Sequence, residues 1–403
     1  MSFENSGGSF EGMWADLEPI GRVAGSGGYR RFAWTSADAT LREWFTGEAA
    51  RRGLEVVGDR AGNLWAWTSD PDASGPGLVL GSHLDSVPDG GAFDGPLGIV
   101  SAFAALDLLR ARGVSLPRPV GIACFADEEG ARFGIACAGS RLITGALDAD
   151  RARALTDESG TTLAEAMSAA GADPRHLGRD DETLRRIGTF VELHVEQGRG
   201  LVHSGAAVGV ASSIWPHGRW RLDLRGRADH AGTTALADRE DPMLALAAVI
   251  VAARAAAEGH GTVATVGKVR VTPNGVNAIP SAVTAWLDAR GPAEGDVRKV
   301  VAEVAAAAGI DPVEESWTAS TEFEPTLRDR LSIALARPDG RPAPVLATGA
   351  GHDAGILAAA GIPTAMLFVR NPTGVSHSPA EHADPEDCLA GIEALARAVE
   401  TLA

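Results

Sequence analysis

Residues 81–98, with the sequence GSHLDSVPDGGAFDGPLG, place one imidazole and two carboxylates in a glycine-rich segment. His83 and Asp85 are two residues apart, so on an extended backbone their side chains face the same side. Asp94 follows beyond a Gly- and Pro-rich loop. The preceding apolar run, 77–80, predicts a buried parallel strand. Imidazole and carboxylate groups at a strand end can form a metal site, at the position where open α/β sheets bind their ligands.

A second apolar run, VGIACFA at residues 120–126, also predicts a buried strand. Three acids follow it directly, namely Asp127, Glu128 and Glu129. Consecutive carboxylates at the end of a buried strand raise one another's pKa, so a nearby cation would stabilise them. The position of these acids therefore indicates that they belong to the same metal site as His83 and Asp94.

Two further predicted strands end near histidines. The segment TFVELHV at 189–195 alternates in polarity and carries His194 on one face with acidic neighbours. The buried strand predicted at 363–369 leads into a loop that contains His377. All these residues lie at strand ends or in adjoining loops, where one edge of a sheet can bring them together.

Five of these side chains suffice for two metal ions about 3.5–4 Å apart. Asp94 would bridge the ions, His83 and His194 would bind one, and Glu129 and His377 would bind the other. Glu128 would then be available as a general base that accepts a proton from the attacking water. Histidine and carboxylate ligands without thiolate suit zinc, manganese, cobalt or nickel.

Composition narrows the class of protein. A chain of 403 residues predicts two domains, and its 45% hydrophobic and 22% charged residues are typical of a soluble globular protein. A net charge of −17 argues against nucleic acid and anionic membranes as partners. Three cysteines without a CxxC spacing predict no disulfide framework. We see no signal-peptide pattern and no apolar run long enough for a bilayer, so we expect a cytoplasmic location.

The pattern of predicted elements changes near residue 211 and again near 326. Outside this interval, strands alternate with helices, as in an α/β domain. Inside it, the predicted order is β-α-β-β-α-β, which is the ferredoxin-like pattern. We therefore expect a catalytic domain at 1–210 and 327–403, with an α+β domain at 211–326 inserted into it.

The chain resembles the hydantoinase/carbamoylase family of amidohydrolases in seven segments, which are, in chain order, GSHLDSVPDGGAFDG, ADEEGARFG, ELHVEQG, DHAGTT, VNAIP, GAGHDAG and GVSHSPAEH. The family includes N-carbamoyl-L-amino-acid hydrolases and allantoate amidohydrolases, within the dinuclear aminoacylase/carboxypeptidase superfamily. The resemblance covers nearly the whole chain. It implies a dinuclear-metallopeptidase-like α/β catalytic domain whose inserted ferredoxin-like domain serves as lid and dimerisation domain.

Position by position, the resemblance implies the same five metal ligands, with Glu128 as the catalytic base and Asp85 as the carboxylate that orients His83. The substrate-binding residues of the family fall on Gln197, His230, Asn277, Arg290 and Gly351. His217 lies where the family varies, which leaves the substrate open. In the relatives, the residue at His230 reaches the active site of the other subunit, so we expect a homodimer formed through the inserted domain.

The residues themselves agree with two of these roles. Arg290 ends a predicted strand, and its planar guanidinium suits a substrate carboxylate. His230, in a loop with Gly and Thr residues, could donate to a tetrahedral oxyanion.

We therefore expect a metal-dependent hydrolase of a non-peptide C–N bond in a small carboxylate substrate, either an N-carbamoyl-L-amino acid or allantoate. A hydrolase of N-formyl or N-formimino amino acids is an alternative. A peptidase of the superfamily is a weaker one, because segment 196–198 and the VNAIP loop favour the amidase branch. A catalytically inactive binding protein is the alternative from another class, against which the intact Glu128 and ligand set argue.

Overall fold

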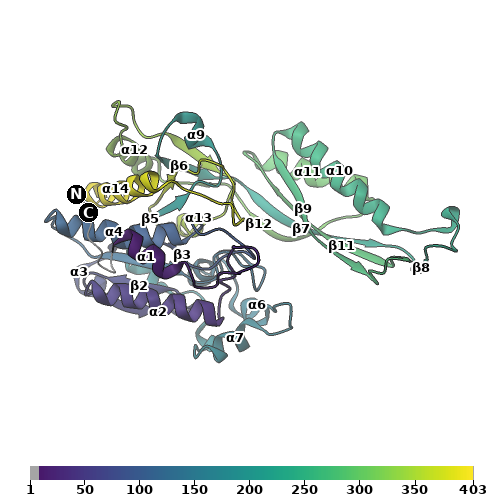
Figure 1. Ribbon diagram of the computed structural model, residues 1–403, viewed down its shortest axis with the longest axis horizontal. Helices are drawn as coiled ribbons and strands as arrows, with labels where there is room; N and C mark the ends of the chain where they lie inside the picture. The colour runs from purple at the N-terminus through teal and green to yellow at the C-terminus, as the bar shows by residue number, and fades with distance from the viewer. Residues whose placement is uncertain (1–8, 403) are drawn as a thin grey trace. The chain divides into compact units, whose positions relative to one another are not determined.

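The computed structural model describes residues 9–402, and the chain divides into two compact units (Figure 1). Unit 1 comprises Met1–Ser212 and Glu322–Ala403, and unit 2 comprises Ser213–Thr321. Unit 2 is thus an insertion in unit 1, and each unit has its own hydrophobic core. The sequence-based boundaries, 210/211 and 326/327, lie close to this division.

Within residues 9–402, unit 1 is built on a nine-stranded sheet of order β1-β2-β4-β3-β5-β15-β6-β13, with β14 paired to β6. The central strands β4, β3, β5 and β15 are parallel to one another. The bounds are β1 (Glu55–Gly58), β2 (Leu64–Trp67), β3 (Gly77–His83), β4 (Val120–Phe125), β5 (Ile187–Val195), β6 (Val208–Ile214), β13 (Thr321–Glu322), β14 (Val345–Thr348) and β15 (Thr364–Val369).

The four parallel strands are buried along nearly their whole length. This burial explains why β3, β4 and β15 are mainly apolar runs, whereas β5 also carries Glu192 and His194. All four are predicted from the sequence. β6, β13 and β14 are not, because their short segments of small and polar residues lack a clear period. The mixed α/β architecture confirms the predicted fold class.

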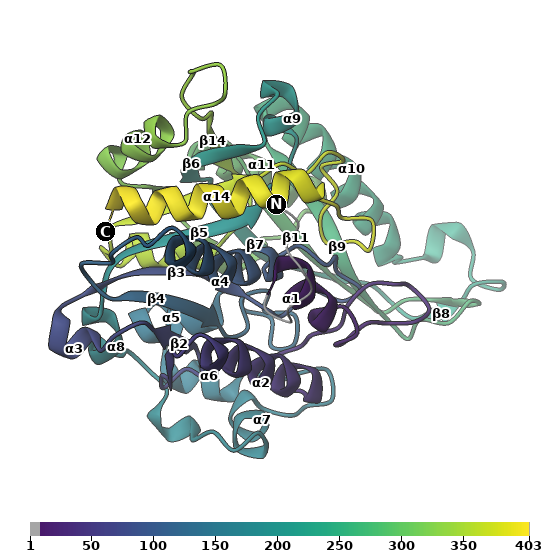
Figure 2. The ribbon, with the colours of Figure 1, turned by 60° about the vertical axis from the view of Figure 1, so that its left-hand side comes forward.

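Two long helices, α4 (Pro96–Ala111) and α14 (Pro385–Leu402), lie side by side against this sheet (Figure 2). Pro96 is in the first turn of α4, where its missing N–H costs nothing. Phe103 and Leu97 of α4 pack in the same core cluster as Leu193 of β5. The helix therefore anchors the loop that precedes it, which carries Asp94.

The remaining helices of unit 1 surround the sheet. The predicted helix at 40–52 is α2, which ends before Gly53, a residue with φ of 65°. The helices are α1 (Phe10–Leu17), α2 (Ser36–Arg51), α3 (Pro71–Ser74), α5 (Ala138–Thr144), α6 (Ala149–Ala154), α7 (Leu163–Ala169), η1 (Pro174–His176), α8 (Asp181–Arg185), α9 (Gly200–Ser204), α12 (Pro325–Ala334) and α13 (Asp353–Ala359).

Unit 2 contains a four-stranded antiparallel sheet of order β12-β7-β11-β9, and helices α10 and α11 pack on it. Its chain order is the predicted β-α-β-β-α-β. A two-stranded sheet, β8 with β10, is not predicted. The elements are β7 (His217–Arg225), β8 (Asp229–His230), η2 (Leu236–Asp238), α10 (Pro242–His260), β9 (Val263–Thr272), β10 (Ala278–Ile279), β11 (Ala282–Arg290), α11 (Glu294–Ala308) and β12 (Val313–Thr318).

Helix α10 corrects one sequence-based expectation. Its 19 residues, with a mean hydropathy of 1.5, are long and apolar enough to cross a membrane by length and composition alone. Val249 and Ala253 on one side, however, belong to the hydrophobic core of unit 2. Leu244 and Val251 on another side are exposed. The helix is therefore explained as a core helix with an additional apolar surface, and nothing in its packing indicates a membrane.

Candidate metal centre

The parallel strands bring the predicted site residues to one edge of the unit 1 sheet. His83 is the last residue of β3, and it pairs in register with Phe125, the last residue of β4. His194 lies in β5 opposite Phe368 of β15. Because parallel strands end at the same edge, the loops after β3, β4, β5 and β15 meet there. Strand order thus explains why residues far apart in the sequence converge.

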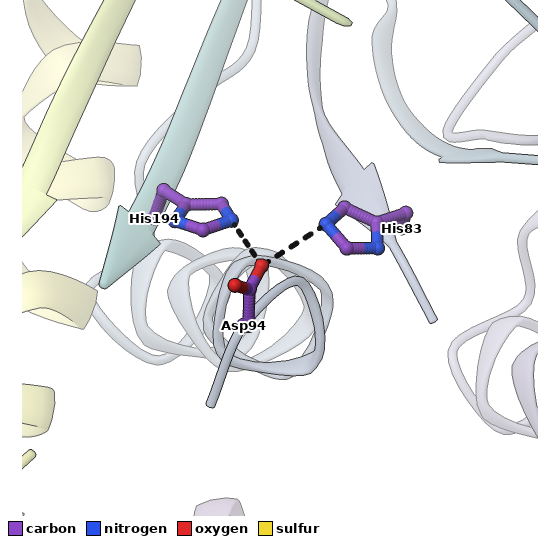
Figure 3. Close-up of side chains that lie close together, drawn as sticks. All are labelled: His83, Asp94 and His194. Carbon is purple, nitrogen blue, oxygen red and sulfur yellow. Dashed lines mark ion pairs between the residues drawn. The ribbon is translucent and has the colours of Figure 1, made fainter. Parts of the chain in front are cut away.

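His83, Asp94 and His194 form the first candidate metal-binding group (Figure 3). Asp94 Oδ1 lies 3.5 Å from His83 Nε2 and 3.0 Å from His194 Nε2. The relative exposures of the three residues are 0%, 6% and 1%, respectively. Water is therefore largely excluded from these donor atoms.

The hydrogen bonds of the two rings determine which nitrogens face Asp94. His83 Nδ1 lies 3.2 Å from the carbonyl oxygen of Asp85, and His194 Nδ1 lies 2.9 Å from that of Val195. A carbonyl only accepts hydrogen bonds, so both Nδ1 atoms must donate. Both Nε2 atoms are buried and have no hydrogen-bond partner. In the neutral rings, two lone pairs therefore face a carboxylate oxygen, which requires a cation or a proton between them.

The pKa of His194 also indicates that a positive charge is favoured beside Asp94. Burial opposes a charge on His194, but the charges of Asp94 and Glu192 outweigh it and raise the pKa of that ring to about 9. The surroundings of this ring therefore favour a positive charge beside Asp94. The donor set and its unpartnered nitrogens fit a divalent metal ion.

Asp94, Glu129 and His377 form a second candidate group. His377 Nε2 lies 3.5 Å from Asp94 Oδ2 and 3.5 Å from Glu129 Oε2. Asp94 therefore belongs to both groups, with Oδ1 toward the first and Oδ2 toward the second. One carboxylate that offers a different oxygen to each group is the arrangement of a bridging ligand in two-metal sites.

A third group combines Glu192, His194 and His352. The carboxylate of Glu192 already accepts hydrogen bonds from Ser82 Oγ at 3.1 Å and from the Ala354 amide at 3.0 Å. The rings of His194 and His352 are in contact, with their centroids 4.5 Å apart. Glu192 and His352 are therefore further neighbours of His194, and the sequence does not reveal that His352 lies there.

Glu128 lies beside the first group, with Oε2 3.7 Å from His83 Nε2. Burial raises its pKa to about 7; the charges of Asp85 and Asp94 add to this effect and that of His83 opposes it. Burial and the charge of Asp94 also raise the pKa of Glu129 well above its usual range. A buried carboxyl group that titrates near neutrality has the property that a general base requires.

Asp85 holds this acidic segment in place. Its carboxylate accepts hydrogen bonds from the amides of Glu128 at 3.1 Å and Glu129 at 3.0 Å, and Oδ1 lies 3.4 Å from His83 Nδ1. The Nδ1 atom itself bonds to the backbone oxygen of Asp85. The carboxylate that the resemblance assigns to His83 therefore lies beside that ring and also positions the acid pair.

Gln197 and Gly351, two predicted substrate-binding residues, also lie in unit 1. Gln197 Nε2 donates to Asp94 Oδ2 at 2.8 Å and to Ser376 Oγ at 3.1 Å. Gln197 is thus in contact with the second candidate group. Gly351 is partly buried and directly precedes His352.

The other predicted substrate-binding residues form two separate pairs in unit 2. His217 and Arg290 are register partners at one end of the β7–β11 pair. Arg290 donates from Nε to Asp288 Oδ1 at 2.8 Å and from Nη2 to Asp288 Oδ2 at 2.7 Å, so one edge of the guanidinium is already held.

His230 and Asn277 belong to the β8–β10 region beyond the other end of these strands, where the Ala231 amide donates to the Asn277 carbonyl oxygen at 2.9 Å. Both residues are exposed. The eight residue steps from Ala282 to Arg290 span roughly 25–30 Å at about 3.4 Å per residue. The sequence-based expectation that Arg290 and Asn277 together hold the substrate carboxylate therefore does not fit the geometry of a single chain.

Comparison with known proteins identifies the family. A model of peptidase family M20/M25/M40 matches residues 79–401. The chain belongs to this family. An N-carbamoyl-L-amino acid amidohydrolase of Geobacillus stearothermophilus is 36% identical over 405 residues, which cover 98% of each chain. An allantoate amidohydrolase of Escherichia coli (strain K12) is 32% identical over 399 residues, 94% of each chain.

Among solved structures, an amidase of the hydantoinase/carbamoylase family from Burkholderia vietnamiensis resembles this M20 protein with a TM-score of 0.88. The two are 28% identical, and the match covers 97% of this chain and 95% of that one. The resemblance inferred from the seven sequence segments is thereby confirmed. The M20 protein is an enzyme that acts on amides, and its family implies the use of divalent metal ions.

Proposed function

We propose that this M20 amidohydrolase hydrolyses the C–N bond of a ureido group in a small carboxylate substrate, an N-carbamoyl-L-amino acid or allantoate. The observation that carries the proposal is the position of Asp94, which offers one oxygen to each of two donor groups beside Glu128. The relatives named for N-carbamoyl-L-amino acids and allantoate support the ureido class.

Two divalent ions, most simply zinc, fit the two groups. His83, Asp94 and His194 would hold one ion, and Asp94, Glu129 and His377 would hold the other. When bound, such ions act as Lewis acids and make water a stronger acid. Manganese, cobalt and nickel accept the same ligands.

Glu128 would move the proton. Its buried carboxylate accepts a proton from the attacking water and returns it to the leaving nitrogen, so the amine leaves as a neutral group. Its environment supports this role because burial brings its pKa to about 7. Neither Asp94 nor Glu129 would be available for proton transfer, since both serve as ligands.

The two pairs in unit 2 would recognise the substrate. Arg290, which Asp288 orients, would bind the substrate carboxylate beside His217, and Gln197 and Gly351 would contribute from unit 1. His230 and Asn277 would act on the developing oxyanion. Because the pairs lie at or beyond opposite ends of the β7–β11 strands, we assign them to the active sites of two different subunits.

A homodimer formed through unit 2 would make this possible. The exposed face of α10 presents Leu244, Ile250 and Val251, with exposures of 73%, 46% and 69%. β9 is an edge strand of the four-stranded sheet, so its outer backbone groups are available to a second copy. A symmetric pairing of these surfaces would bury both features.

A reducing, cytoplasmic location agrees with the cysteines. Cys124, Cys137 and Cys388 are all buried and free. Cysteines of this kind are typical of proteins from a reducing compartment.

A substrate panel tests the proposed function. Metal-free protein is reconstituted with zinc, manganese, cobalt or nickel and assayed with allantoate, several N-carbamoyl-L-amino acids, N-formylglutamate and dipeptides. We expect activity only with metal and only on a ureido compound, and Glu128→Gln serves as the inactive control. Hydrolysis of N-formylglutamate or of dipeptides in preference to every ureido compound would refute the proposal.

A further inference from the structure

The loop after β15 contains a buried acid that belongs to none of the candidate metal groups of residues 9–402. Glu381 has an exposure of 5% and lies four residues after His377. A buried carboxylate close to Asp94 is unfavourable by charge alone. Its presence therefore calls for a compensating interaction.

That interaction is with the backbone of the loop that carries Asp94. Glu381 Oε1 accepts hydrogen bonds from the amides of Phe93 and Asp94, both at 2.9 Å. Hydrogen bonds to an ionised acceptor are among the stronger ones in proteins. A Cβ atom at Gly91 would collide with the Glu381 carboxylate, so the close approach of the two loops also requires this glycine.

The second oxygen extends the contact to the side chain of Asp94. Glu381 Oε2 lies 3.2 Å from Ser376 Oγ, and Ser376 Oγ lies 3.2 Å from Asp94 Oδ2. The serine hydroxyl has one proton and can donate to one of these carboxylates at a time. Residues 376–381 therefore hold both the backbone and the side chain of Asp94.

We propose that Glu381, assisted by Ser376, is a positioning residue that locks the loop of Asp94 to the loop of His377, so that both metal-binding groups form together. The inference rests on the proposed function, in which Asp94 bridges two ions. Loss of the lock would let Asp94 move relative to His377. Metal affinity would therefore fall, and kcat would fall only when the metal concentration is limiting.

Zinc titration of metal-free protein against a competing chelator tests the proposal. Glu381→Ala removes both hydrogen bonds to the amides and should weaken zinc binding by roughly 10–100-fold, the usual cost of losing a partner of a metal ligand. Glu381→Gln keeps an oxygen for the amides and an N–H for Ser376, so it should stay within a few-fold of wild type. Glu386→Ala, which removes an exposed acid from α14, is the matched control.

The kinetic pattern separates positioning from a direct catalytic role. For Glu381→Ala, kcat should fall at limiting zinc and recover at saturating zinc, with KM for the substrate nearly unchanged. If this variant does not fold, Ser376→Ala replaces it, with a weaker second zinc site and an unaffected first site as the expected result. Zinc affinities equal to wild type in the folded variant would overturn the inference, as would a Glu381→Gln variant as weak as Glu381→Ala.

The proposed function fails in a different way. If wild-type protein binds no divalent ion, or binds two ions but hydrolyses no ureido compound, the proposed function is wrong. Two ions bound equally tightly by wild type and Glu381→Ala would refute only the role of Glu381.

Discussion

The two units of the chain present their candidate site residues in opposite ways. In unit 1, His83 and His194 have exposures of 0% and 1%, and their ring nitrogens converge on one oxygen of Asp94. In unit 2, His230 and Asn277 are exposed, and they lie at the far end of the sheet from Arg290.

The difference separates two ways of building a site. Buried side chains on parallel strands are held by the core, so their geometry is set before any ligand binds. Exposed side chains on an antiparallel sheet are free to meet a second surface, and their geometry is completed only there. The candidate metal groups therefore lie preformed in unit 1, whereas the roles proposed for His230 and Asn277 require a second surface.

The largest expected effect is in unit 1. Glu128→Gln should lower kcat by roughly 10²–10⁴-fold, because only the proton transfer is removed. Both metal ions should remain, as measured by elemental analysis of the purified variant. Loss of metal together with activity would instead exchange the roles of Glu128 and Glu129.

His230→Ala tests the exposed pair in unit 2. The loss of one oxyanion donor should lower kcat by roughly 10²–10³-fold with metal content unchanged. The sharper measurement mixes this variant with Glu128→Gln and lets the subunits exchange. If His230 acts in the partner's site, one of the two sites in each heterodimer is intact, and about half of the wild-type activity per dimer should return. Mixed dimers as inactive as either parent would place His230 in its own subunit or outside the reaction.

Arg290→Lys tests the other pair in unit 2, at the opposite end of the β7–β11 strands. A single ammonium cannot replace a planar guanidinium, and lost charge-assisted hydrogen bonds should raise KM by roughly 10–100-fold. Metal content should not change. Arg298→Lys is the matched control, because Arg298 pairs with Glu314 within unit 2 and has no assigned role in binding. An unchanged KM for a carboxylate substrate would exclude Arg290 as the anchor.

The smallest expected effect is the change in stability on metal removal, and this change should distinguish the two units most directly. Without cations, the buried acids after β4 repel one another, so chelation should lower the unfolding temperature of the protein by a few degrees. Hydrogen exchange should rise at residues 83–95 and 126–130 and remain unchanged in β9. Equal increases of hydrogen exchange in both units would show that bound metal stabilises unit 2 as well as unit 1.

Much of the site in unit 1 is predictable because its residues follow strands that are themselves recognisable. Three of the four parallel strands are mainly apolar runs and β5 alternates in polarity, and each strand contains or leads into histidine or acidic residues. Glu381 and Ser376 are harder to identify, although they lie in the same loop as His377. Their roles depend on contacts with Asp94, which is 287 residues away from Glu381 along the chain.

The sequence by itself predicted the fold class, which is confirmed. It also predicted an α/β unit with an inserted β-α-β-β-α-β unit and the residues that could hold metal, since these predictions depend on local periodicity and on the chemistry of side chains. Only the tertiary structure decided that Asp94 turns a different oxygen to each group, that Asp85 serves the amides of Glu128 and Glu129, and that Arg290 and Asn277 are separated by the length of a strand pair. The reason is that such facts depend on distances between distant segments, which strand order and register set and local sequence does not contain.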